Sequence, residues 1–267
     1  MEITGLFIYP IKSMGGISLK SSTVEMRGLK YDRRWMLVDE NNRFLSQREQ
    51  PFLSRFSLVL NDEFFTVTNN LNNEQVNIPL EKVSGKNKKV HVWEDEVLAT
   101  VVQSEISMWF SNQIGQMVDL VYQPNESIRP VDSNHTITGE EHNSLSDGYP
   151  VLLISEASLE YINSHCPERI PMERFRPNIV VKNIEAFEED KLEKLCFNDV
   201  ELYGVKPCAR CNVPNLNPET LTFSKEPSLT LSKIRKFGNK ILFGQNLVVH
   251  KIGRINVGDK KSEFDLS

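Results

Sequence analysis

Two cysteines beside basic side chains are the residues of this chain best suited to chemistry. The segment Lys206-Pro207-Cys208-Ala209-Arg210-Cys211 holds them in a Cys-x-x-Cys motif. Cationic neighbours favour the thiolate form of a cysteine, which is the form that attacks an electrophile or binds a metal. The motif therefore predicts a nucleophile or a metal ligand.

Three interpretations of this motif remain open from the residues alone. A thioredoxin-like redox pair would open a helix, but Pro214 and Pro218 follow closely and disfavour a helix there. A structural zinc site needs four ligands, and the only other candidates near in sequence are Cys166, Cys196 and His165. The third interpretation is two partly buried cysteines with packing roles, which is common for free cysteines.

Basic residues beside predicted strand ends form a second group of candidates. Arginine favours bidentate contacts with phosphate, so these side chains are suited to an anion pocket, although each alone is more often a solvated surface charge. The group consists of Lys12 with Ser13, Arg33, Arg34, Arg48, Arg174 and Arg176.

Short strands are expected to position these residues. Alternating apolar residues bounded by polar turns predict strands over 3–9, 35–39, 43–45, 56–60, 64–67, 90–93, 179–182, 200–205, 246–250 and 254–257. The polar segment 122–148 shows no clear periodicity and is expected to be a long loop, a kind of segment that is often functional.

Three helices are expected among the strands. Apolar residues at three- and four-residue spacing predict a helix over 105–114, with Ser104 as its N-cap and Gly115 just past its end. Similar patterns predict helices over 155–164 and 228–237, the last ending at Gly238. The fold class expected is therefore mainly β with a few helices, a mixed α+β protein.

Composition excludes several classes of protein. The 267 residues carry 31 Lys and Arg against 36 Asp and Glu, a net charge of −5, so attraction to nucleic acid or to an anionic membrane is not expected. The chain has 39% hydrophobic residues but no apolar run near the roughly 20 residues of a membrane span, and its N-terminus is not that of a secretory signal. Four cysteines exclude a disulfide scaffold and fit a reducing compartment such as the cytoplasm.

Several segments together resemble a known family. Tyr9-Pro10-Ile11-Lys12-Ser13, Asp32-Arg33-Arg34-Trp35 and Ser46-Gln47-Arg48 resemble the N-terminal β-barrel domain that accompanies MOSC domains. Four further segments resemble the MOSC domain itself: Ser155-Glu156-Ala157-Ser158-Leu159, Arg174-Phe175-Arg176-Pro177-Asn178, Cys208-Ala209-Arg210-Cys211 and Ile255-Asn256-Val257-Gly258-Asp259. The resemblance implies a β-barrel-like domain over residues 1–120, packed on a MOSC β-barrel over residues 121–267.

The resemblance also implies a cofactor and the residues that bind it. Members of this family that resemble the chain are the mitochondrial amidoxime-reducing component and bacterial reductases of N-hydroxylated compounds, which use a molybdenum cofactor (Mo-molybdopterin). The second cysteine of the family motif ligates molybdenum, which carries over to Cys211 as metal ligand and catalytic residue. The implied cofactor-binding residues are Lys12, Ser13, Arg33, Arg48, Asp147, Arg176, Asn178 and Arg210.

The implied function is that of a detoxifying oxidoreductase. It would reduce small N-hydroxylated compounds (hydroxylamines, amidoximes and hydroxylaminopurines) to amines or amidines. With four cysteines the chain is not expected to carry an iron–sulfur relay, nor is it expected to carry the membrane anchor of the mitochondrial relatives. A separate flavin, cytochrome or iron–sulfur protein would therefore supply the electrons.

The chain departs from the family pattern after the implied ligand. A Thr-Thr pair and an Asp-Pro usually follow that cysteine, whereas this chain has Pro214-Asn215 and Asn217-Pro218. Asn-Pro retains turn-forming chemistry, so the loop is still expected to fold, but the substrate preference is open. The alternative function is a non-catalytic molybdenum-cofactor carrier, or a protein of sulfur or cofactor transfer.

Overall fold

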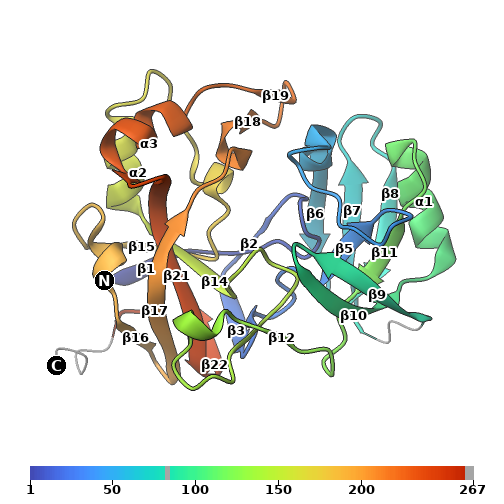
Figure 1. Ribbon diagram of the computed structural model, residues 1–267, viewed down its shortest axis with the longest axis horizontal. Coiled ribbons are helices and arrows are strands. Elements are labelled where there is room, and N and C mark those ends of the chain that lie inside the picture. Colours follow the sequence, from blue (N-terminus) through green and yellow to red (C-terminus); the bar gives the residue numbers. More distant parts are fainter. Residues whose placement is uncertain (82–84, 262–267) are drawn as a thin grey trace.

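Two lobes of β-sheet pack side by side in the computed structural model (Figure 1), which describes residues 1–81 and 85–261. The larger lobe contains most of the C-terminal half of the chain and two of the helices. The smaller lobe contains the strands of residues 35–122 and the remaining helix. The chain is thus mainly β with a few helices, as its residue patterns predict.

The main sheet of the larger lobe is mixed. Its strands, in spatial order, are β16 (Lys194–Phe197), β17 (Val200–Ala209), β21 (Lys240–Lys251), β14 (Val151–Ser155), β15 (Ile179–Lys182), β1 (Glu2–Ile8) and β2 (Ile17–Leu19), with β20 (Lys236–Phe237) paired to β21. Among the strand pairs of this sheet in the described residues, β14 and β15 alone run parallel. Residues 156–178, which include helix α2 (Glu156–Asn163), connect them and are long enough for the crossover that a parallel pair needs. Beside this sheet lie β22 (Gly253–Asn256), β3 (Ser21–Glu25) and β4 (Gly28–Leu29).

The smaller lobe combines two antiparallel sheets with one helix. One sheet has the order β5 (Trp35–Val38), β11 (Asp119–Tyr122), β10 (Asp95–Val101) and β9 (Asn87–Val92), and the other has the order β6 (Phe56–Leu60), β7 (Phe64–Asn69) and β8 (Gln75–Pro79). Two short ribbons complete the fold: β12 (Arg129–Pro130) with β13 (His142–Asn143), and β18 (Leu216–Asn217) with β19 (Thr222–Phe223).

The helices lie where periodicity predicts them, with corrections at two ends. Helix α1 (Ser104–Ile114) ends at Gly115 with a φ of 75°, but its N-cap is Gln103, so the prediction of Ser104 as N-cap is wrong. Helix α2 (Glu156–Asn163) is capped by the Ser155 hydroxyl, which accepts from the Ser158 N–H.

The third helix is shorter than predicted. Helix α3 (Ser228–Ile234) stops three residues early because Lys236 and Phe237 pair with β21 as β20. The strand predicted over 43–45 is also wrong: Arg43 and Phe44 form only isolated bridges, to His91 and Val38. The first difference comes from a tight hairpin, because the chain turns back at Gly238 and pairs β20 with β21. In the second, the bridge between Arg43 and His91 joins residues far apart in sequence, which a short pattern does not reveal.

Strands from the start of the chain are part of the larger lobe. β1 pairs with β15, and β3 pairs with β22 near the other end of the described chain. The chain then crosses into the smaller lobe between β4 and β5 and returns after β11. The division into domains 1–120 and 121–267 stays a prediction.

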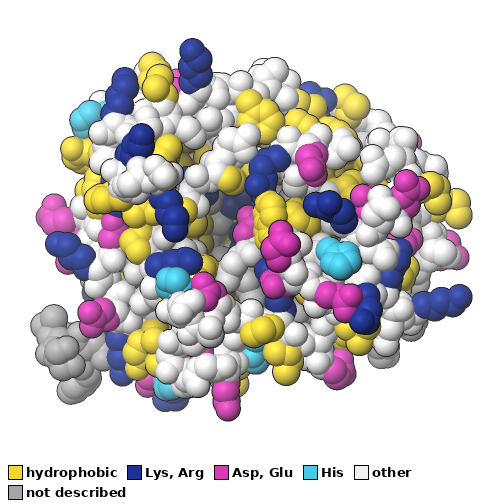
Figure 2. All heavy atoms as spheres, in the orientation of Figure 1, with side chains coloured by type: hydrophobic (Ala, Val, Ile, Leu, Met, Phe, Trp, Pro, Cys, Tyr) yellow, Lys and Arg dark blue, Asp and Glu magenta, His cyan; other side chains and the backbone are white. Residues whose placement is uncertain are grey.

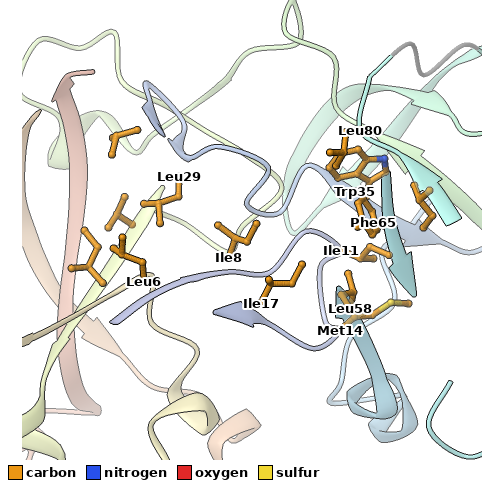
Figure 3. Packing of buried hydrophobic residues seen from close by; sticks show 14 of the residues in the cluster. Leu6, Ile8, Ile11, Met14, Ile17, Leu29, Trp35, Leu58, Phe65 and Leu80 are labelled. Atoms are coloured by element: carbon orange, nitrogen blue, oxygen red, sulfur yellow. The ribbon is translucent and has the colours of Figure 1, made fainter. Parts of the chain in front are cut away.

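One hydrophobic core extends through both lobes. Figure 3 shows Leu6, Ile8 and Ile11 continuing along the N-terminal segment toward Trp35 and Phe65 of the smaller lobe. All five side chains are fully buried. Burial of large apolar side chains across the junction holds the lobes against each other, and this fixes the cavity between them.

No helix in the described ranges is both long enough and apolar enough to cross a bilayer.

Candidate functional site

A cavity of about 150 Å³ lies between the two lobes. The face drawn in Figure 2 is hollowed at this junction, with Lys and Arg side chains along the edge of the hollow. All nine residues expected at the site line the cavity: Lys12, Ser13, Arg33, Arg48, Asp147, Arg176, Asn178, Arg210 and Cys211. They come from segments up to two hundred residues apart, which the fold brings to one place.

Strand ends and loops supply these side chains. Lys12 and Ser13 follow β1, and Arg33 precedes β5. The segment around Asp147 leads into β14, and Arg176 leads into β15. Two other basic residues lie elsewhere: Arg34 is held by the Gln123 carbonyl and Tyr122, and Arg174 lines a neighbouring cavity.

The cysteine motif lies at the end of the long strand β17. Cys208 is half-buried, and its Sγ accepts from Nη1 of Arg210 at 3.3 Å, whereas Cys211 lies beyond the strand and is exposed. Nη2 of Arg210 donates to the Phe175 carbonyl at 2.7 Å. The two thiols therefore differ: one is held by the arginine and the other is available to a ligand.

The structure weakens two interpretations of this motif. A short 3₁₀ turn (Val213–Asn215) follows Cys211 in place of the α-helix that a thioredoxin-like pair needs. Across residues 1–81 and 85–261, no group of three His, Cys, Asp or Glu side chains is close enough to hold a metal ion. A zinc site built from protein side chains alone is therefore absent from these ranges.

Two arginines that line the cavity, Arg33 and Arg176, pack against the ring of Tyr9. The guanidinium carbons of Arg33 and Arg176 lie 4.3 and 4.1 Å from the ring centroid. Burial lowers the pKa of Arg176 to about 10, with nearby Arg33 adding to this effect, so Arg176 stays cationic at neutral pH. Burial raises the pKa of Tyr9 to about 12 and keeps its hydroxyl protonated. The cavity thus has a fixed cationic part.

A buried carboxylate holds Arg33 in place. Asp32 is fully buried; its Oδ2 accepts from Nη1 of Arg33 at 2.6 Å, and its Oδ1 accepts from the Tyr9 N–H at 2.8 Å. Arg33 also donates to Oδ1 of Asn178 at 3.0 Å and to the Arg176 carbonyl at 3.2 Å. This network orders the guanidinium group before any ligand arrives.

Left-handed backbone recurs at the cavity. Ser13, Arg33 and Arg176 have φ angles of 70°, 46° and 57°, a region that residues other than glycine seldom adopt. Such conformations persist only where the surroundings enforce them, and they concentrate at ligand-binding sites. Their clustering here marks the cavity as a site built for binding.

An ion pair links the lobes at the rim of the cavity. Nζ of buried Lys12 donates to Oδ1 of exposed Asp147 at 2.5 Å, and Nε1 of Trp93 donates to the same oxygen at 3.3 Å. Although much of the Asp147 side chain is exposed, partial desolvation works against its ionisation; the charge and hydrogen bond of Lys12 outweigh this and lower the pKa of the carboxyl. Burial likewise lowers the pKa of Lys12, which Asp147 partly offsets.

Asp147→Asn is expected to cost a small amount of stability that depends on pH. Because one partner is exposed, the pair should contribute about 0.5–1 kcal/mol to the free energy of unfolding. The pKa of Asp147 is lower in the folded chain than its ordinary 3.8, so this contribution is complete above that value and is lost as the pH falls further. Urea unfolding of both proteins at about pH 7, 5 and 3 should give equal differences at the first two and a smaller one at the third; a difference that grows with acid would contradict this.

Several lining residues lack any obvious signal in the sequence. Phe44 and Tyr149 line the cavity, and Asp32 and Trp93 contact its lining residues. Asp32 lies in a segment that resembles the family, but it was not among the residues expected at the site. Trp93 lies at the end of a predicted strand, and this position does not indicate that its indole N–H donates a hydrogen bond to Asp147.

Unpartnered polar atoms and free space indicate that the cavity is built for a ligand. Nε of Arg210 and the hydroxyl of Tyr149 are buried without a hydrogen-bond partner among the described residues. Such groups are costly unless a ligand or water satisfies them. A second cavity of about 590 Å³ shares Gln47, Arg176 and Val213 with the first, so the two cavities adjoin and offer more space than the first alone.

Comparison with known proteins agrees with the sequence resemblance. The model of the MOSC N-terminal beta barrel domain matches residues 1–117, and that of the MOSC domain matches residues 140–261. The chain is 30% identical to mitochondrial amidoxime-reducing component 1 of Danio rerio and 29% identical to mitochondrial amidoxime reducing component 2 of Rattus norvegicus. Each alignment covers 96% of this chain, with 83% and 81% of the two relatives.

A third relative is larger. The chain is 29% identical to molybdenum cofactor sulfurase of Oryza sativa subsp. japonica over 91% of its own length, which is 32% of that protein. The family models between them match both lobes, and the alignments with the amidoxime-reducing components run through nearly the whole chain. This chain therefore belongs to the MOSC-domain family, in the form that carries the MOSC N-terminal β-barrel domain, and is related to the amidoxime-reducing components and to molybdenum cofactor sulfurase.

Proposed function

We propose that this protein is a molybdenum-cofactor-dependent reductase of small N-hydroxylated compounds. The observation that carries the proposal is the cavity in which cationic side chains from both lobes converge beside one exposed thiol, that of Cys211. The names of the relatives aligned over 96% of the chain support the same reaction class.

The residues present fit such a cofactor. Lys12, Arg33 and Arg176 supply positive charge for an anionic phosphate, with Ser13 as a hydroxyl donor. The unpartnered Nε of Arg210 gives a further donor, close to the cysteine motif. Cys211 would be the protein ligand of the metal, because a soft thiolate suits a metal already bound by sulfur. Asn178, Arg48 and Asp147 complete the proposed binding set.

The chain itself supplies binding, orientation and a fixed charge pattern. When bound, the cofactor supplies the two-electron chemistry that removes oxygen from nitrogen. Arg33 and Arg176 are ordered in advance by Asp32 and Tyr9, so little freedom is lost on binding an anion. Exposure of Cys211 leaves the metal end accessible to a small substrate, and the Tyr149 hydroxyl is a free donor in the cavity wall.

The proposal includes the source of the electrons and the compartment in which the protein works. None of the four cysteines is paired in a disulfide, and the described residues hold no cluster that would bind a metal without a cofactor, so we propose a separate flavin, cytochrome or iron–sulfur protein as donor. Free cysteines also agree with a cytoplasmic protein that detoxifies N-hydroxylated compounds.

The test is metal analysis paired with a reduction assay. Protein made in a host that synthesises the cofactor should contain about one molybdenum per chain, and with an artificial electron donor it should convert benzamidoxime to benzamidine. Arg176→Leu should lower the metal content by at least about tenfold, since it removes a charge-assisted contact. Absence of molybdenum in correctly folded protein would refute the proposal.

A carrier of the cofactor is the second candidate. The relation to molybdenum cofactor sulfurase, a protein whose name places it in cofactor handling, is the observation that favours it. Bound molybdenum with no turnover of any N-hydroxylated compound, and transfer of the cofactor to a second protein, would support the carrier over the reductase.

A further inference from the structure

Trp93 occupies an unusual position beside the cavity. It lies in the turn between β9 and β10, with a φ of 57° and 43% of its surface exposed. A large aromatic residue in left-handed backbone is a genuine outlier, which other contacts must hold in place.

Three contacts hold the Trp93 ring at the rim of the cavity. The guanidinium carbon of Arg48 lies 4.3 Å from the ring centroid, and the Phe44 ring lies at 5.0 Å and 70°. The indole N–H donates to Asp147 of the other lobe. All three partners line the cavity, so Trp93 extends its wall outward.

The Phe44 ring continues the same surface inward. Nζ of Lys12 lies 4.8 Å from its centroid, and Phe44 is itself a lining residue. Trp93 and Phe44 therefore form an aromatic edge that leads from the surface to the cationic part of the cavity. The three lining residues that contact Trp93 fix its orientation, while almost half of its surface remains open.

We propose that Trp93, supported by Phe44, is the specificity-determining surface on which the planar aromatic part of a substrate stacks. This inference rests on the proposed reductase function. It names the substrate class: aryl or heteroaryl amidoximes and hydroxylamines are bound in preference to alkyl ones. Aromatic stacking tolerates many ring systems because each has a π face, and it contributes nothing to a substrate that lacks a ring.

A purely structural role for Trp93 would give different results. If the indole only supported Asp147 and Arg48, its removal would loosen the cofactor site and slow all substrates alike. If it stacks on substrate, removal raises the KM of aryl substrates while kcat, metal content and alkyl substrates change little. The comparison of two substrates on one protein preparation separates these roles.

The experiment uses cofactor-loaded protein and three variants. Trp93→Gly removes the ring and accepts the left-handed backbone, whereas Trp93→Phe keeps a stacking ring but loses the N–H donor. Tyr161→Ala is the matched control, since Tyr161 is also 43% exposed but lies on α2, away from the cavity. Each protein is assayed on benzamidoxime and acetamidoxime, with molybdenum measured in parallel.

The expected result is a selective change. Trp93→Gly should raise the KM for benzamidoxime about fivefold to tenfold and leave that for acetamidoxime within about twofold, with Trp93→Phe close to wild type and Tyr161→Ala unchanged. Equal changes for both substrates, or lower molybdenum content in Trp93→Gly, would overturn the proposal.

A binding measurement keeps this inference separate from the proposed function. Trp93 is one of three tryptophans, and Trp35 is buried, so benzamidine should quench the protein fluorescence in wild type and much less in Trp93→Phe, whereas acetamidine should quench neither. Quenching without turnover would refute the reductase but retain the stacking surface. Turnover with no difference between aryl and alkyl ligands would retain the reductase and refute the surface.

Discussion

Replacing Cys211 by serine is expected to leave the fold intact and to remove nearly all bound molybdenum. The side chain is exposed at the end of β17, so the substitution creates no cavity in the core. Serine is a hard, weakly acidic oxygen donor and replaces a thiolate poorly at a soft metal. Loss of groups that only support a metal ligand costs about 10- to 100-fold in affinity or activity, and loss of the ligand should exceed about 100-fold.

Cys208→Ser provides the matched control from the same motif. Cys208 is half-buried, and its sulfur accepts from Arg210, which in turn holds the Phe175 carbonyl. A serine hydroxyl can accept the same donor, so molybdenum content should fall by less than about threefold. Metal content and benzamidoxime turnover measured on both variants decide the assignment; equal losses at the two positions would contradict Cys211 as the single protein ligand.

The strands of this fold could be predicted where their pattern is local. Residues 56–60 and 64–67 alternate around a polar turn, and they pair in the structure as β6 and β7. The pattern of residues 43–45 is as good, yet Arg43 and Phe44 form only isolated bridges, to His91 and to Val38 of β5. The bridge to His91 depends on how distant segments meet, which a short segment does not show.

The residues of the site likewise divide into those that could be predicted from the sequence and those that could not. Basic residues could be selected by type and by their place beside strand ends, and nine of the expected residues do line one cavity. Arg34 and Arg174 have the same local features but bind carbonyl groups elsewhere. Trp93 and Tyr149 could not be predicted, because their roles depend on how the lobes pack against each other.

The buried carboxylate at the centre of the site gives the second large effect. Asp32→Asn keeps the size of the side chain but removes its charge, leaving Arg33 without its ion-pair partner beside the cationic Arg176. Removing one member of a buried pair costs about 3 kcal/mol or more, because the remaining charge is uncompensated. For a chain of 267 residues this corresponds to a fall in melting temperature of about 6–12 °C.

Asp32→Asn should also loosen the cationic part of the cavity. The Asp32 carboxylate accepts both the Arg33 guanidinium and the Tyr9 N–H, and Tyr9 is the ring against which Arg33 and Arg176 pack. An amide can replace only one of these acceptor contacts without turning a donor toward the other group. Molybdenum content is therefore expected to fall along with stability, which a change confined to the surface would not cause.

Thermal unfolding and metal analysis of Asp32→Asn, with Asp62→Asn as control, test this expectation. Asp62 lies exposed in the turn between β6 and β7, so its replacement should change the free energy of unfolding by less than about 0.5 kcal/mol. The effect of Asp32→Asn arises because the carboxylate offsets charge repulsion between two arginines that the site needs close together. An Asp32→Asn protein as stable and as rich in molybdenum as wild type would show that those arginines hold their positions without it.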